Sequence, residues 1–600
     1  MEASNDERFF VILELLRRGI SKEAIHEVTK IDYFFLHIFA QLIDVEQSIG
    51  NWQLDTIDEE AFAHLKELGF SDRYLAKQWQ TTEYEVRSKR KELGIIASYK
   101  MVDTCAAEFA SPTSYFYSSY SGENEQTVSE RKKVLIIGSG PIRIGQGIEF
   151  DYCSVHSVFA LQQENIESIM INNNPETVST DFATADKLYF EPLTLEYVLN
   201  VIEAEQVEEV IVQFGGQTAI NLGEDLEKAG IKLLGTSFDT VDQLEDRDRF
   251  YQLLEKLDIP HVPGAIANNE DELLQLAEEL GFPVLVRPSY VIGGSGMNIY
   301  ENREELKVGI EGNSYPLLID KYVPGKEAEV DLVADGKDIC IPVIAEHIEK
   351  AGIHSGDSMA YLPSQTLSEG IINKIVIYAE KMVQHLQYKG LMNIQYVISG
   401  EDVYVLEVNP RASRTIPIIS KVANVPLVQI ATKLLLGKYS LSDLVEKTGL
   451  LEPFNYYVVK YPVFSTFALN GLDSKLGPEM KSTGEGIAIA DSKEEALAKA
   501  FAFLEKSIQA HGNEVYITSS VTLDDELIDA MKATDLVPVY DIPLESWLKD
   551  RKGKVILSLK DEEQTERLKA AKYRLLPFTS IETFKAYVEG SAVKELTISS

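Results

Sequence analysis

A change in the hydrophobic pattern near residue 132 constrains the fold of this chain more than any other feature of its sequence. Four short apolar runs follow it, "KKVLIIGSG", "SIMINNN", "EEVIVQFGG" and "IKLLGTS", with helical patterns between them. Such runs are typical of buried strands. Strands that alternate with helices predict βαβ units and a doubly wound parallel sheet, whose strand ends usually bind ligands.

The chain before this point has a different pattern. From Asp6 to about Leu93, apolar residues recur at helical spacing, as in "RFFVILELLRRGISKEAIHEVTKIDYFFLHIFAQL". This spacing predicts an N-terminal helical domain. The stretch from 111 to 130 is rich in serine, tyrosine and turn-forming residues, and we interpret it as an ordered crossing or linker.

Further regions follow the predicted parallel sheet. One helix is expected over "DQLEDRDRFYQLLEKLDIP", and a second α+β region is expected from about residue 260 to 490. From about residue 495, short αβ units appear, such as "EVYITSS" and "GKVILSL". With 600 residues and no long internal repeat, the chain is expected to be a multidomain α/β protein, since one domain usually has about 100 to 200 residues.

Composition argues against several classes of function. Lys and Arg number 57 against 95 Asp and Glu, and the net charge of −38 opposes binding to nucleic acid. No apolar run approaches the roughly 20 residues that span a bilayer, so membrane insertion is not expected. The three cysteines are scattered, and "MEASNDERFF" lacks the basic and apolar regions of a signal peptide, so a cytoplasmic location is expected.

The stretch "VYVLEVNPRASRTIP", which begins at residue 403, carries the strongest sign of chemistry. A short turn separates it from 393–397, which predicts an antiparallel hairpin. Side chains alternate across a strand, so Glu407 and Asn409 are predicted to lie on one face. Gln395 is predicted nearly opposite Glu407, and three oxygen-bearing side chains therefore converge.

Two arginines, Arg411 and Arg414, follow this strand, where Pro410 ends it and directs them into a loop. Mg²⁺ takes carboxylate and carbonyl oxygens and commonly joins protein ligands to nucleotide phosphates. Phosphoryl transfer also needs positive charge around the moving group. A solvent-facing polar strip explains any one of these side chains, but the five together predict a nucleotide and metal site.

A glycine-rich turn is a less specific sign. Arg287 ends a predicted buried strand just before Gly293, Gly294 and Gly296. Small residues at such a turn let backbone amides approach a phosphate. A plain hairpin loop explains the same turn equally well.

Two other motifs are not expected to carry a cofactor. His347 and His354 are seven residues apart across a glycine break, which is poor spacing for a zinc site on one helix, and core or loop histidines are the simpler interpretation. "IIGSGPIRIGQG" is an imperfect G-x-G-x-x-G motif, and "INNNPE" replaces the acidic residue expected about 20 positions later. A dinucleotide site is therefore not expected.

Several of these motifs together resemble one family closely. "VLIIGSGPIRIGQGIEFDYC", "NNNPETVSTD", "VQFGGQTAINL", "VRPSYVIGG", "EHIEKAGIHSGDS", "GLMNIQYV" and "LEVNPRASRTIPIISK" look like the large subunit of carbamoyl phosphate synthetase, in the order found in its C-terminal synthetase half. Upstream, "RRGISKEAIHEVTKID" and "YKMVDTCAAEFASPTSYFYSSY" resemble the helical domain that joins its two halves. The resemblance covers roughly residues 5 to 490.

The resemblance implies four domains with distinct roles. They are a helical oligomerisation domain at 1–122, a Rossmann-like pre-ATP-grasp domain at 123–238, an ATP-grasp domain at 239–495, and a truncated, regulatory-like α/β domain at 496–600.

The resemblance also implies a reaction. In this family a glutaminase small subunit supplies ammonia, the N-terminal half makes carboxyphosphate and then carbamate, and the C-terminal half phosphorylates carbamate with ATP. This chain is then expected to be a ligase for that last step, with the N-terminal half and the glutaminase subunit as partners and a homo-oligomer formed through the helical domain. Another ATP-grasp acyl-phosphate ligase and a non-catalytic nucleotide-binding scaffold are the alternatives.

Residue by residue, the resemblance implies overlapping groups of site residues. Those expected to contact ATP are Arg287, Lys321, Val323, Glu329, Gly352, Ile353, His354, Ser355, Gln395 and Glu407. Those expected to bind Mg²⁺ or Mn²⁺ are Gln395, Glu407 and Asn409. Arg411 and Arg414 are expected to face phosphate and carbamate and, with Arg287 and Asn409, to form the catalytic set. A potassium site is also implied, although no spacing in this sequence reveals it.

Two positions depart from the family's pattern. Lys321 stands where some members have histidine. Residues 496–600 are shorter than the family's regulatory domain and show no phosphate-cradling loop, so nucleotide regulation through them is expected to be reduced or absent. The reduced domain favours arginine over pyrimidine synthesis as the destination of the product.

Overall fold

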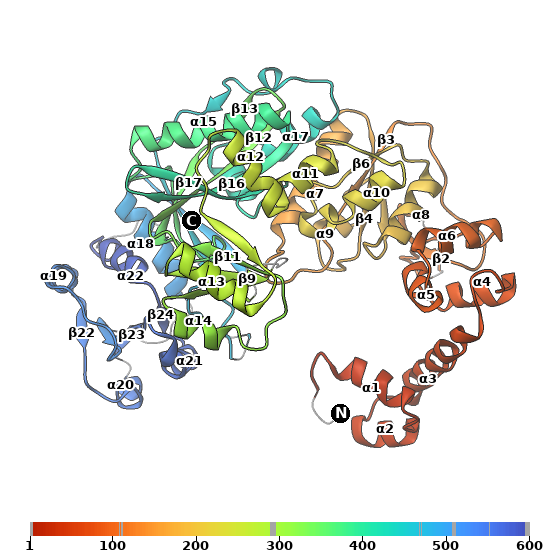
Figure 1. The fold of residues 1–600 in the computed structure, drawn as a ribbon, viewed down its shortest axis with the longest axis horizontal. Helices are drawn as coiled ribbons and strands as arrows, with labels where there is room; N and C mark the ends of the chain where they lie inside the picture. The colour runs from red at the N-terminus through yellow and green to blue at the C-terminus, as the bar shows by residue number, and fades with distance from the viewer. Residues whose placement is uncertain are drawn as a thin grey trace. The chain divides into compact units, whose positions relative to one another are not determined.

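The structure is a computed structural model that describes residues 4–106, 108–109, 112–288, 296–466, 468–469, 471–506, 512–550 and 552–593 (Figure 1). The chain forms two compact units. Unit 1 comprises Met1–Lys132 and Asp186–Glu208, and unit 2 comprises Lys133–Ala185 and Glu209–Ser600. Helices and strands occur in both units, which agrees with the multidomain α/β prediction.

Unit 1 begins with short helices, which confirms the helical prediction for this region. Most of them start at a Ser, Thr or Asp whose side chain accepts a hydrogen bond from a backbone amide of the first turn, as Ser21 does from Ala24 at 3.2 Å. The helices are α1 (Arg8–Arg17), α2 (Lys22–Thr29), α3 (Tyr33–Ser48), α4 (Glu59–Glu67), α5 (Asp72–Trp79) and α6 (Glu83–Glu92).

The same unit contains strands that the sequence did not indicate. β2 (Tyr115–Ser119) lies in the stretch interpreted as an ordered crossing or linker, and it shows that part of this stretch is a strand. It pairs antiparallel with β1 (Ser98–Met101) and parallel with β5 (Lys187–Phe190). The apolar pattern that would predict this strand is weak. Only Phe116 of β2 is fully buried, and the other residues of the strand are tyrosines and serines.

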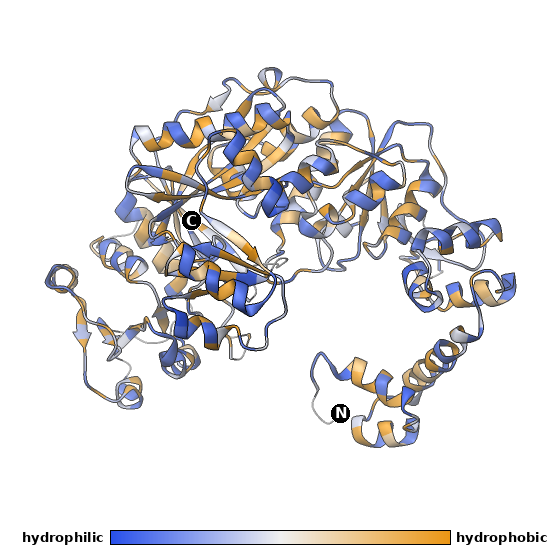
Figure 2. Cartoon of the chain, viewed as in Figure 1, coloured by the Kyte–Doolittle hydropathy of each residue, from blue (hydrophilic) through white to orange (hydrophobic). Residues whose placement is uncertain are grey.

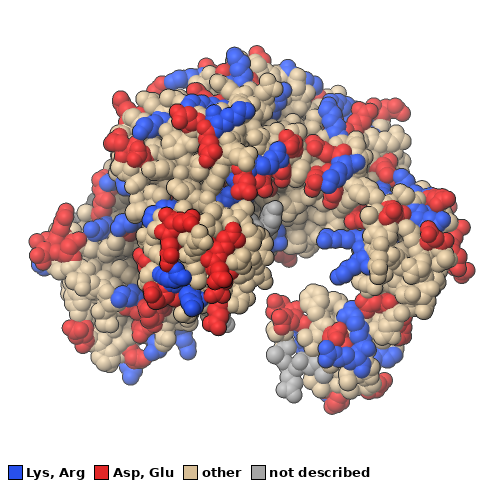
Figure 3. Space-filling view, in the orientation of Figure 1, with Lys and Arg blue, Asp and Glu red and all other residues tan. Residues whose placement is uncertain are grey.

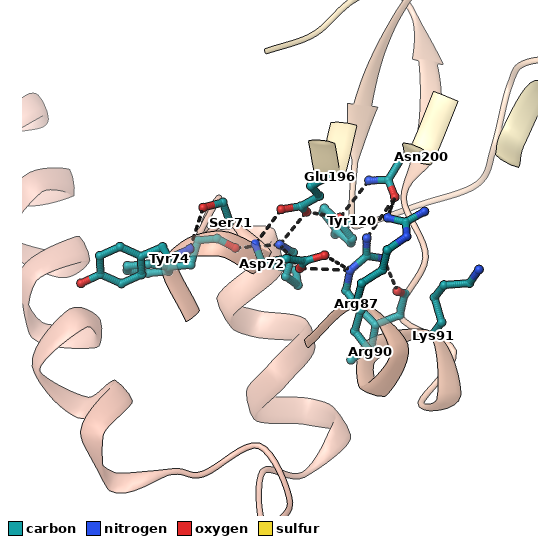
Figure 4. Close-up of polar contacts among 12 residues, drawn as sticks. Ser71, Asp72, Tyr74, Arg87, Arg90, Lys91, Tyr120, Glu196 and Asn200 are labelled. Atoms are coloured by element: carbon teal, nitrogen blue, oxygen red, sulfur yellow. Dashed lines mark hydrogen bonds and ion pairs between the residues drawn. The ribbon is translucent and has the colours of Figure 1, made fainter. Parts of the chain in front are cut away.

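A buried ionic network ties the helices of unit 1 to α8 (Leu195–Glu205), as Figure 4 shows. Lys66 Nζ lies 2.8 Å from Asp72 and 2.7 Å from Glu196, and Arg90 Nε lies 2.8 Å from Asp72. The Tyr120 hydroxyl donates to Glu196 at 2.7 Å. These charged side chains are almost fully buried, so each depends on the others for compensation.

The predicted parallel sheet is confirmed at the start of unit 2. Its strands are ordered β4-β3-β6-β7, and each neighbouring pair is parallel. The strands are β3 (Lys133–Ile137), β4 (Glu167–Asn172), β6 (Glu209–Ile211) and β7 (Lys232–Leu233). The helices that follow β3 and β6 are α7 (Glu149–Gln163), α9 (Gly216–Ile220) and α10 (Gly223–Lys228).

The single helix expected after this sheet is two helices, so that prediction was wrong in detail. α11 (Phe238–Glu245) ends at Asp246, and α12 (Arg247–Lys256) begins there. Asp246 has an extended backbone, and its side chain accepts a hydrogen bond from Arg249 N at 2.9 Å. An aspartate in this role starts a new helix, and the continuous charged pattern concealed the break.

Two antiparallel sheets form the next region of unit 2. The smaller has the order β10-β9-β11-β8, and the larger has the order β17-β16-β12-β14-β15-β19-β20, with β13 and β18 at its side. The smaller sheet contains β8 (Gly264–Ala267), β9 (Val284–Pro288), β10 (Asn298–Tyr300) and β11 (Leu317–Lys321), with α13 (Glu270–Leu280) and α14 (Arg303–Gly309). The larger contains β12 (Lys326–Asp335), β13 (Ile339–Ile341), β14 (Ile344–Lys350), β15 (Ala360–Leu362), β16 (Lys389–Ser399), β17 (Asp402–Asn409), β18 (Gly449–Leu450), β19 (Tyr457–Val463) and β20 (Gly484–Ala490).

One face of the larger sheet forms the main core of this region. Val330, Ile394 and Val408 on the strands pack with residues of α12 and α15 (Glu369–Leu386), including Phe250 and Met382. Figure 2 shows hydrophobic residues concentrated along these strands. The apolar residues alternate with polar ones, so the opposite face of the same strands is polar.

The C-terminal region is a small parallel sheet of order β22-β21-β23-β24. Its strands are β21 (Glu514–Ile517), β22 (Val537–Val539), β23 (Gly553–Leu557) and β24 (Leu576–Phe578). Its helices are α18 (Lys493–Glu505), α19 (Asp525–Ala533), α20 (Leu544–Asp550), α21 (Gln564–Lys572) and α22 (Ile581–Gly590). The short αβ units expected from about residue 495 are confirmed.

Within the described part of the chain, no single helix has the length and apolarity needed to cross a membrane. One pair passes that test when taken together, α16 (Ile416–Val422) with α17 (Leu427–Leu435), which are bent by 110° at a short break.

Candidate nucleotide site

The predicted hairpin and its register are confirmed. β16 and β17 run antiparallel, and Gln395 lies opposite Glu407. A bulge follows this pair, so the register shifts only beyond Gln395, toward the turn. β12 pairs on the other side of β16, with Glu329 opposite Gln395.

Three neighbouring strands therefore place two rows of polar side chains on one face of the larger sheet. Residues two apart on a strand share a face, so both rows lie opposite the apolar core. The first row is Glu407, Gln395 and Glu329, and the second is Asn409, Asn393 and Asp331.

Hydrogen bonds join the predicted metal ligands to their neighbours. Asn409 Nδ2 donates to Glu407 Oε1 at 3.2 Å and to Asn393 Oδ1 at 3.4 Å. Gln395 Nε2 donates to Ser355 Oγ at 3.5 Å. The structure thus brings Gln395, Glu407 and Asn409 together with one of the predicted nucleotide contacts.

Asp331 closes the second row in a fully buried position. It accepts hydrogen bonds from Asn393 at 3.1 Å and Ser413 at 2.6 Å, and a further one from Thr415. Burial, with the nearby charge of Glu329, raises the pKa of Asp331 to about 7. This carboxyl fixes the loop after β17, which carries both predicted arginines.

Arg411 reaches back to the second row from that loop. Its Nη2 donates to Asn409 Oδ1 at 3.1 Å, and its Nε donates to Gln217 Oε1 at 3.2 Å. The guanidinium also lies over the Phe150 ring, 5.7 Å from the centroid. Burial lowers the pKa of Arg411, although nearby carboxylates oppose that effect.

Arg414 lies in a second charged group beside the rows. Its Nη2 is 3.0 Å from Glu149 Oε1 and 3.7 Å from Glu485 Oε1. Lys460 Nζ is 3.8 Å from Glu485 Oε1 and donates to Ser355 O at 2.8 Å. Both carboxylate oxygens of Glu485 are buried without a hydrogen bond, and burial raises the pKa of this group.

His347 and His354 are a buried strand histidine and a loop histidine, as the sequence suggested. His347 Nδ1 lies 3.4 Å from Glu327, and its Nε2 lies 3.8 Å from Glu329. Burial opposes the charged form of His347, but the two carboxylates raise its pKa to about 9. Burial and the charges of Arg414 and Lys460 lower the pKa of His354 to about 4.

The remaining predicted contacts lie along the loop after β14 and the linker before β12. Gly352 has a positive φ of 96° and donates its amide to Glu327 Oε1 at 2.9 Å. Val323 packs against a small apolar cluster that includes Ala351 and Val397. Ile353 follows Gly352 and is half-buried.

Arg287 and Lys321 lie on the smaller sheet, and no hydrogen bond or ion pair among the described residues joins them to the two rows. Lys321 Nζ donates to the carbonyls of Gly281 at 2.6 Å and Phe282 at 3.2 Å. Arg287 lies on β9, in register with Leu318. Gly293 and Gly294 of the adjoining turn lie outside the described residues, and Gly296 has a positive φ of 73°.

The Asn172 side chain packs against the glycines of the imperfect motif after β3. Asn172 Oδ1 accepts a hydrogen bond from Gly140 N at 2.9 Å. A Cβ on Gly138 would lie only 2.5 Å from the Asn172 side chain. Close approach of Asn172 therefore accounts for the glycine at this position.

Sequence reasoning missed several polar residues of the site. They are Glu327, Asp331, Asn393, Lys460, Glu485 and Glu149. In "EAEVD", Glu327, Glu329 and Asp331 alternate with Ala328 and Val330. This is the same alternation that revealed Glu407 and Asn409, and it was the available signal. Glu485 and Lys460 are far apart in the sequence and gave none.

The donor set fits a small divalent cation. Glu407 offers a carboxylate, and Gln395 and Asn409 offer amide oxygens, which are ligands that Mg²⁺ and Mn²⁺ accept. In this structure the Asn409 oxygen accepts a hydrogen bond from Arg411, so a cation there would compete with the guanidinium for that oxygen. In the described ranges no group of three or more His, Cys, Asp or Glu side chains could hold a metal ion.

A parallel α/β domain, a small antiparallel sheet and a large antiparallel sheet with a polar face together define an ATP-grasp protein. More specifically, the chain belongs to the carbamoyl phosphate synthase large-chain family. Residues 1–94 match the oligomerisation domain of the large chain, residues 130–243 match the pre-ATP-grasp domain, and residues 246–443 match the ATP-binding domain.

Two curated relatives are similar over nearly the whole chain. The carbamoyl phosphate synthase arginine-specific large chain of Geobacillus stearothermophilus is 59% identical, over 99% of this chain and 57% of that protein. The protein of the same name from Halalkalibacterium halodurans is 48% identical, over 99% of this chain and 58% of that protein. The chain therefore spans a little over half the length of these relatives.

Among solved structures, the biotin carboxylase domain of Hydrogenobacter thermophilus 2-oxoglutarate carboxylase is similar to this chain. The identity is 18% and the TM-score is 0.48, over 63% of this chain and 90% of that one.

Proposed function

We propose that this chain phosphorylates carbamate with MgATP to give carbamoyl phosphate and MgADP, the last step of glutamine-dependent carbamoyl phosphate synthesis. The observation that carries the proposal is the polar face of β12, β16 and β17, with Arg411 and Arg414 directly beyond it. Family membership supports the same reading. An oxygen of carbamate attacks the γ-phosphorus, the bond from that phosphorus to the β,γ-bridging oxygen breaks, and ADP leaves with the electron pair.

We assign each residue of the proposed catalytic set a role according to its position. Arg411 is buried beside Asn409 and offers positive charge to the transferred phosphoryl group, whose oxygens carry charge in the transition state. Arg414 lies between Glu149 and Glu485, where it can orient the carbamate carboxylate. Arg287 and Asn409 complete the proposed catalytic set.

The nucleotide is proposed to lie between the smaller and larger sheets. Its contacts are Arg287, Lys321, Val323, Glu329, Gly352, Ile353, His354, Ser355, Gln395 and Glu407, to which the structure adds Glu327 as a candidate. Gln395, Glu407 and Asn409 would hold Mg²⁺ or Mn²⁺. The cation would neutralise phosphate charge. A potassium ion nearby is a further proposal, taken from the family alone.

The reverse reaction gives the most direct test, because carbamate is unstable in water. Purified chain with MgADP and carbamoyl phosphate should form ATP. Glu407→Gln should lower that rate by at least about a hundredfold, since it removes the only carboxylate among the proposed metal ligands. Glu401→Gln, in the exposed turn of the same hairpin, is the matched control and should leave the rate unchanged. No ATP from the parent chain, or equal rates for both variants, would contradict the proposal.

The proposed partners are the N-terminal synthetase half of the large chain, a glutaminase small subunit and further copies of this chain. The family match to an oligomerisation domain supports the last of these. Asp and Glu side chains are spread over the visible face (Figure 3), which supports the proposal that nucleic acid is not a partner. The relatives' names support a role in arginine synthesis, and a cytoplasmic location is proposed with it.

A further inference from the structure

A surface segment links the C-terminal sheet to the candidate site. This segment, the strap, runs from Gly471 to Ser482 between β19 and β20. At its first end, Asp473 accepts two hydrogen bonds from Arg567 of α21, with Nε–Oδ1 and Nη2–Oδ2 distances of 2.7 Å each. Leu476 adds a third bond, because its amide donates to Thr579 Oγ1 at 3.0 Å.

Arg567 is held rigidly on the side of the C-terminal sheet. Its side chain is 1% exposed, and its Nη1 donates to Ser558 Oγ at 3.1 Å and Lys560 O at 2.5 Å. Burial tends to raise the pKa of Asp473, but the bonds and charge of Arg567 outweigh it and leave that pKa below its usual value. A bidentate pair of this kind fixes the geometry of both partners, since either one alone is an uncompensated charge.

At its second end the strap holds the loop Gly352–Ser358, which carries several of the proposed nucleotide contacts. One of the bonds between them uses a strap side chain, since Ser482 Oγ donates to Gly356 O at 3.0 Å. The others use the backbone of the strap, so they depend on its path. They join His354 N to Gly477 O at 2.8 Å, Lys481 N to Asp357 Oδ2 at 2.9 Å and Ser482 N to Asp357 Oδ1 at 2.9 Å.

The strap also contacts the charged group around Arg414. Met480 Sδ lies 2.8 Å from Arg414 Nη1. A Cβ on Gly356 would lie 2.6 Å from the same nitrogen and 3.2 Å from the sulfur. The three residues are therefore packed without spare room, and a shift of the strap has to move Arg414 or the loop.

The simplest structural alternative is that Arg567 and Asp473 only attach the C-terminal sheet to the rest of unit 2. A hydrophobic core already provides that attachment. It joins Val459 of β19 and Ala488 of β20 to Phe501 and Phe584 of the C-terminal helices. Burial of these apolar residues attaches the C-terminal sheet. The ion pair between Arg567 and Asp473 therefore has a second effect, which is to order the strap.

We propose that Arg567 is a positioning residue for the nucleotide site: through Asp473 it fixes the strap, and the strap fixes both the loop Gly352–Ser358 and Arg414. The C-terminal sheet thereby acts on the site without touching the nucleotide. This inference rests on the proposed function, because it assumes that ADP or ATP binds beside this loop.

Hydrogen exchange tests the mechanical part of the proposal independently of any ligand. Arg567→Met removes the donors at similar volume, and Asp473→Asn perturbs the same pair from the more exposed side. Both should raise amide exchange about tenfold in residues 471–482 and also in 352–358. Lys569→Met is the control, because Lys569 lies on the same helix but pairs with Glu545. Faster exchange in the strap alone, or in neither segment, overturns the proposal.

Nucleotide binding tests the functional part. Calorimetric titration with MgADP, carried out well below the thermal midpoint of each protein, should show about three- to tenfold weaker binding for Arg567→Met and Asp473→Asn than for the parent chain. Arg567→Lys should recover part of the loss, since lysine keeps the charge but not the bidentate fork. Equal affinities for parent and variants overturn the proposal. A parent chain that binds no MgADP would instead count against the proposed function, while hydrogen exchange still decides the role of the strap.

If Arg567→Met does not fold, hydrogen exchange and MgADP titration are both carried out with Asp473→Asn. The Asp473 side chain is 13% exposed against 1% for Arg567, and asparagine keeps one oxygen that can accept from Arg567, so this variant is expected to keep the fold. The same two outcomes then decide the proposal: coupled exchange with weaker MgADP binding supports it, and unchanged exchange in 352–358 overturns it.

Discussion

Asn409 Oδ1 accepts a hydrogen bond from Arg411 Nη2 at 3.1 Å, and Asn409 Nδ2 donates one to Glu407 Oε1 at 3.2 Å. The oxygen proposed as a metal ligand is therefore the acceptor of a guanidinium. A divalent cation at this oxygen would compete with Arg411 for its lone pairs, and we expect the cation to weaken this hydrogen bond and leave Arg411 freer to turn toward the phosphates.

The first prediction follows from this competition. Arg411→Met should lower ATP formation from MgADP and carbamoyl phosphate by about 10² to 10³, because the transferred group loses a positive charge. The Mg²⁺ concentration that gives the half-maximal rate should not increase, because the Asn409 oxygen of this variant no longer accepts a hydrogen bond from a guanidinium. Rates measured across a Mg²⁺ series give both quantities. Arg249→Met, which removes two partly exposed ion pairs, with Asp239 and Asp242, is the control. A higher Mg²⁺ requirement for Arg411→Met would show that Arg411 assists the metal instead.

The second prediction concerns pH and the buried Glu349. Burial raises the pKa of Glu349 to about 7, although Thr583 donates to it at 2.7 Å and Met359 N at 2.9 Å. Because the folded pKa is above the unfolded value, the folded state binds the extra proton between about pH 4.5 and 7. The stability from this group is therefore present at low pH and is lost as pH rises through about 7.

Glu349→Gln should remove this dependence, because the amide does not titrate. The difference in unfolding free energy between parent and variant should change by on the order of 3 kcal/mol between pH 4.5 and 8, in favour of the variant at high pH. Urea unfolding at a series of pH values measures it. The nearby charged groups His347 and Lys350 are unchanged in both proteins, so a constant difference across the series would refute the assignment.

The alternation of polar and apolar residues predicted the hairpin and the position of Gln395 opposite Glu407. A period of two is a local property, so it can be read from a short stretch. The same rule, applied to "EAEVD", would have added Glu327 and Asp331. The sequence alone could not place Glu485 or Lys460, because their approach to Arg414 depends on how strands distant in sequence are ordered in the sheet.

Two local details that the sequence did not reveal have physical causes as well. β2 was not recognised as a strand within the ordered crossing or linker, because a short strand with one buried residue carries little apolar surface. The break at Asp246 was missed because charged residues on both sides continue a helical pattern, and only the backbone of Asp246 shows that it caps a new helix. The four domain boundaries and the residue roles remain predictions.

The third prediction concerns the ionic network of unit 1. Glu196→Gln removes the carboxylate that faces Lys66 at 2.7 Å and accepts the Tyr120 hydroxyl, which leaves a buried ammonium with less compensation. Unfolding of unit 1 should be easier by about 3 to 5 kcal/mol. Glu92→Gln, which removes an exposed partner of Lys89, should cost less than about 1 kcal/mol. Urea unfolding followed by tryptophan fluorescence compares the two variants, and equal costs would mean that the network is not a stabilising unit.

The fourth prediction concerns self-association through α1 and α3. Phe10 is 68% exposed, Phe34 65% and Phe35 51%, which is unusual for aromatic side chains of a soluble surface. Phe10→Ser with Phe34→Ser should shift the sedimentation coefficient toward that of a monomer, because the double variant removes apolar area from the proposed interface. Phe109→Ser is the control, because Phe109 is also exposed but lies outside α1 and α3. An unchanged coefficient for the double variant would exclude this face.

The last prediction concerns regulation by nucleotides through the C-terminal sheet. Hydroxyl groups at the ends of β21 and β23 are placed where a phosphate could bind in a parallel sheet. These hydroxyls already donate hydrogen bonds to a carboxylate, since Ser520 donates to Glu563 at 2.5 Å and Ser558 donates to it at 3.0 Å. A phosphate brought to these hydroxyls would meet the negative charge of Glu563 and lose the donors. Titration with uridine or inosine monophosphate should therefore give no saturable heat, and the reverse rate should not respond to either. Saturable binding that is abolished by Ser520→Ala would show that Glu563 moves away and that the domain does receive an effector.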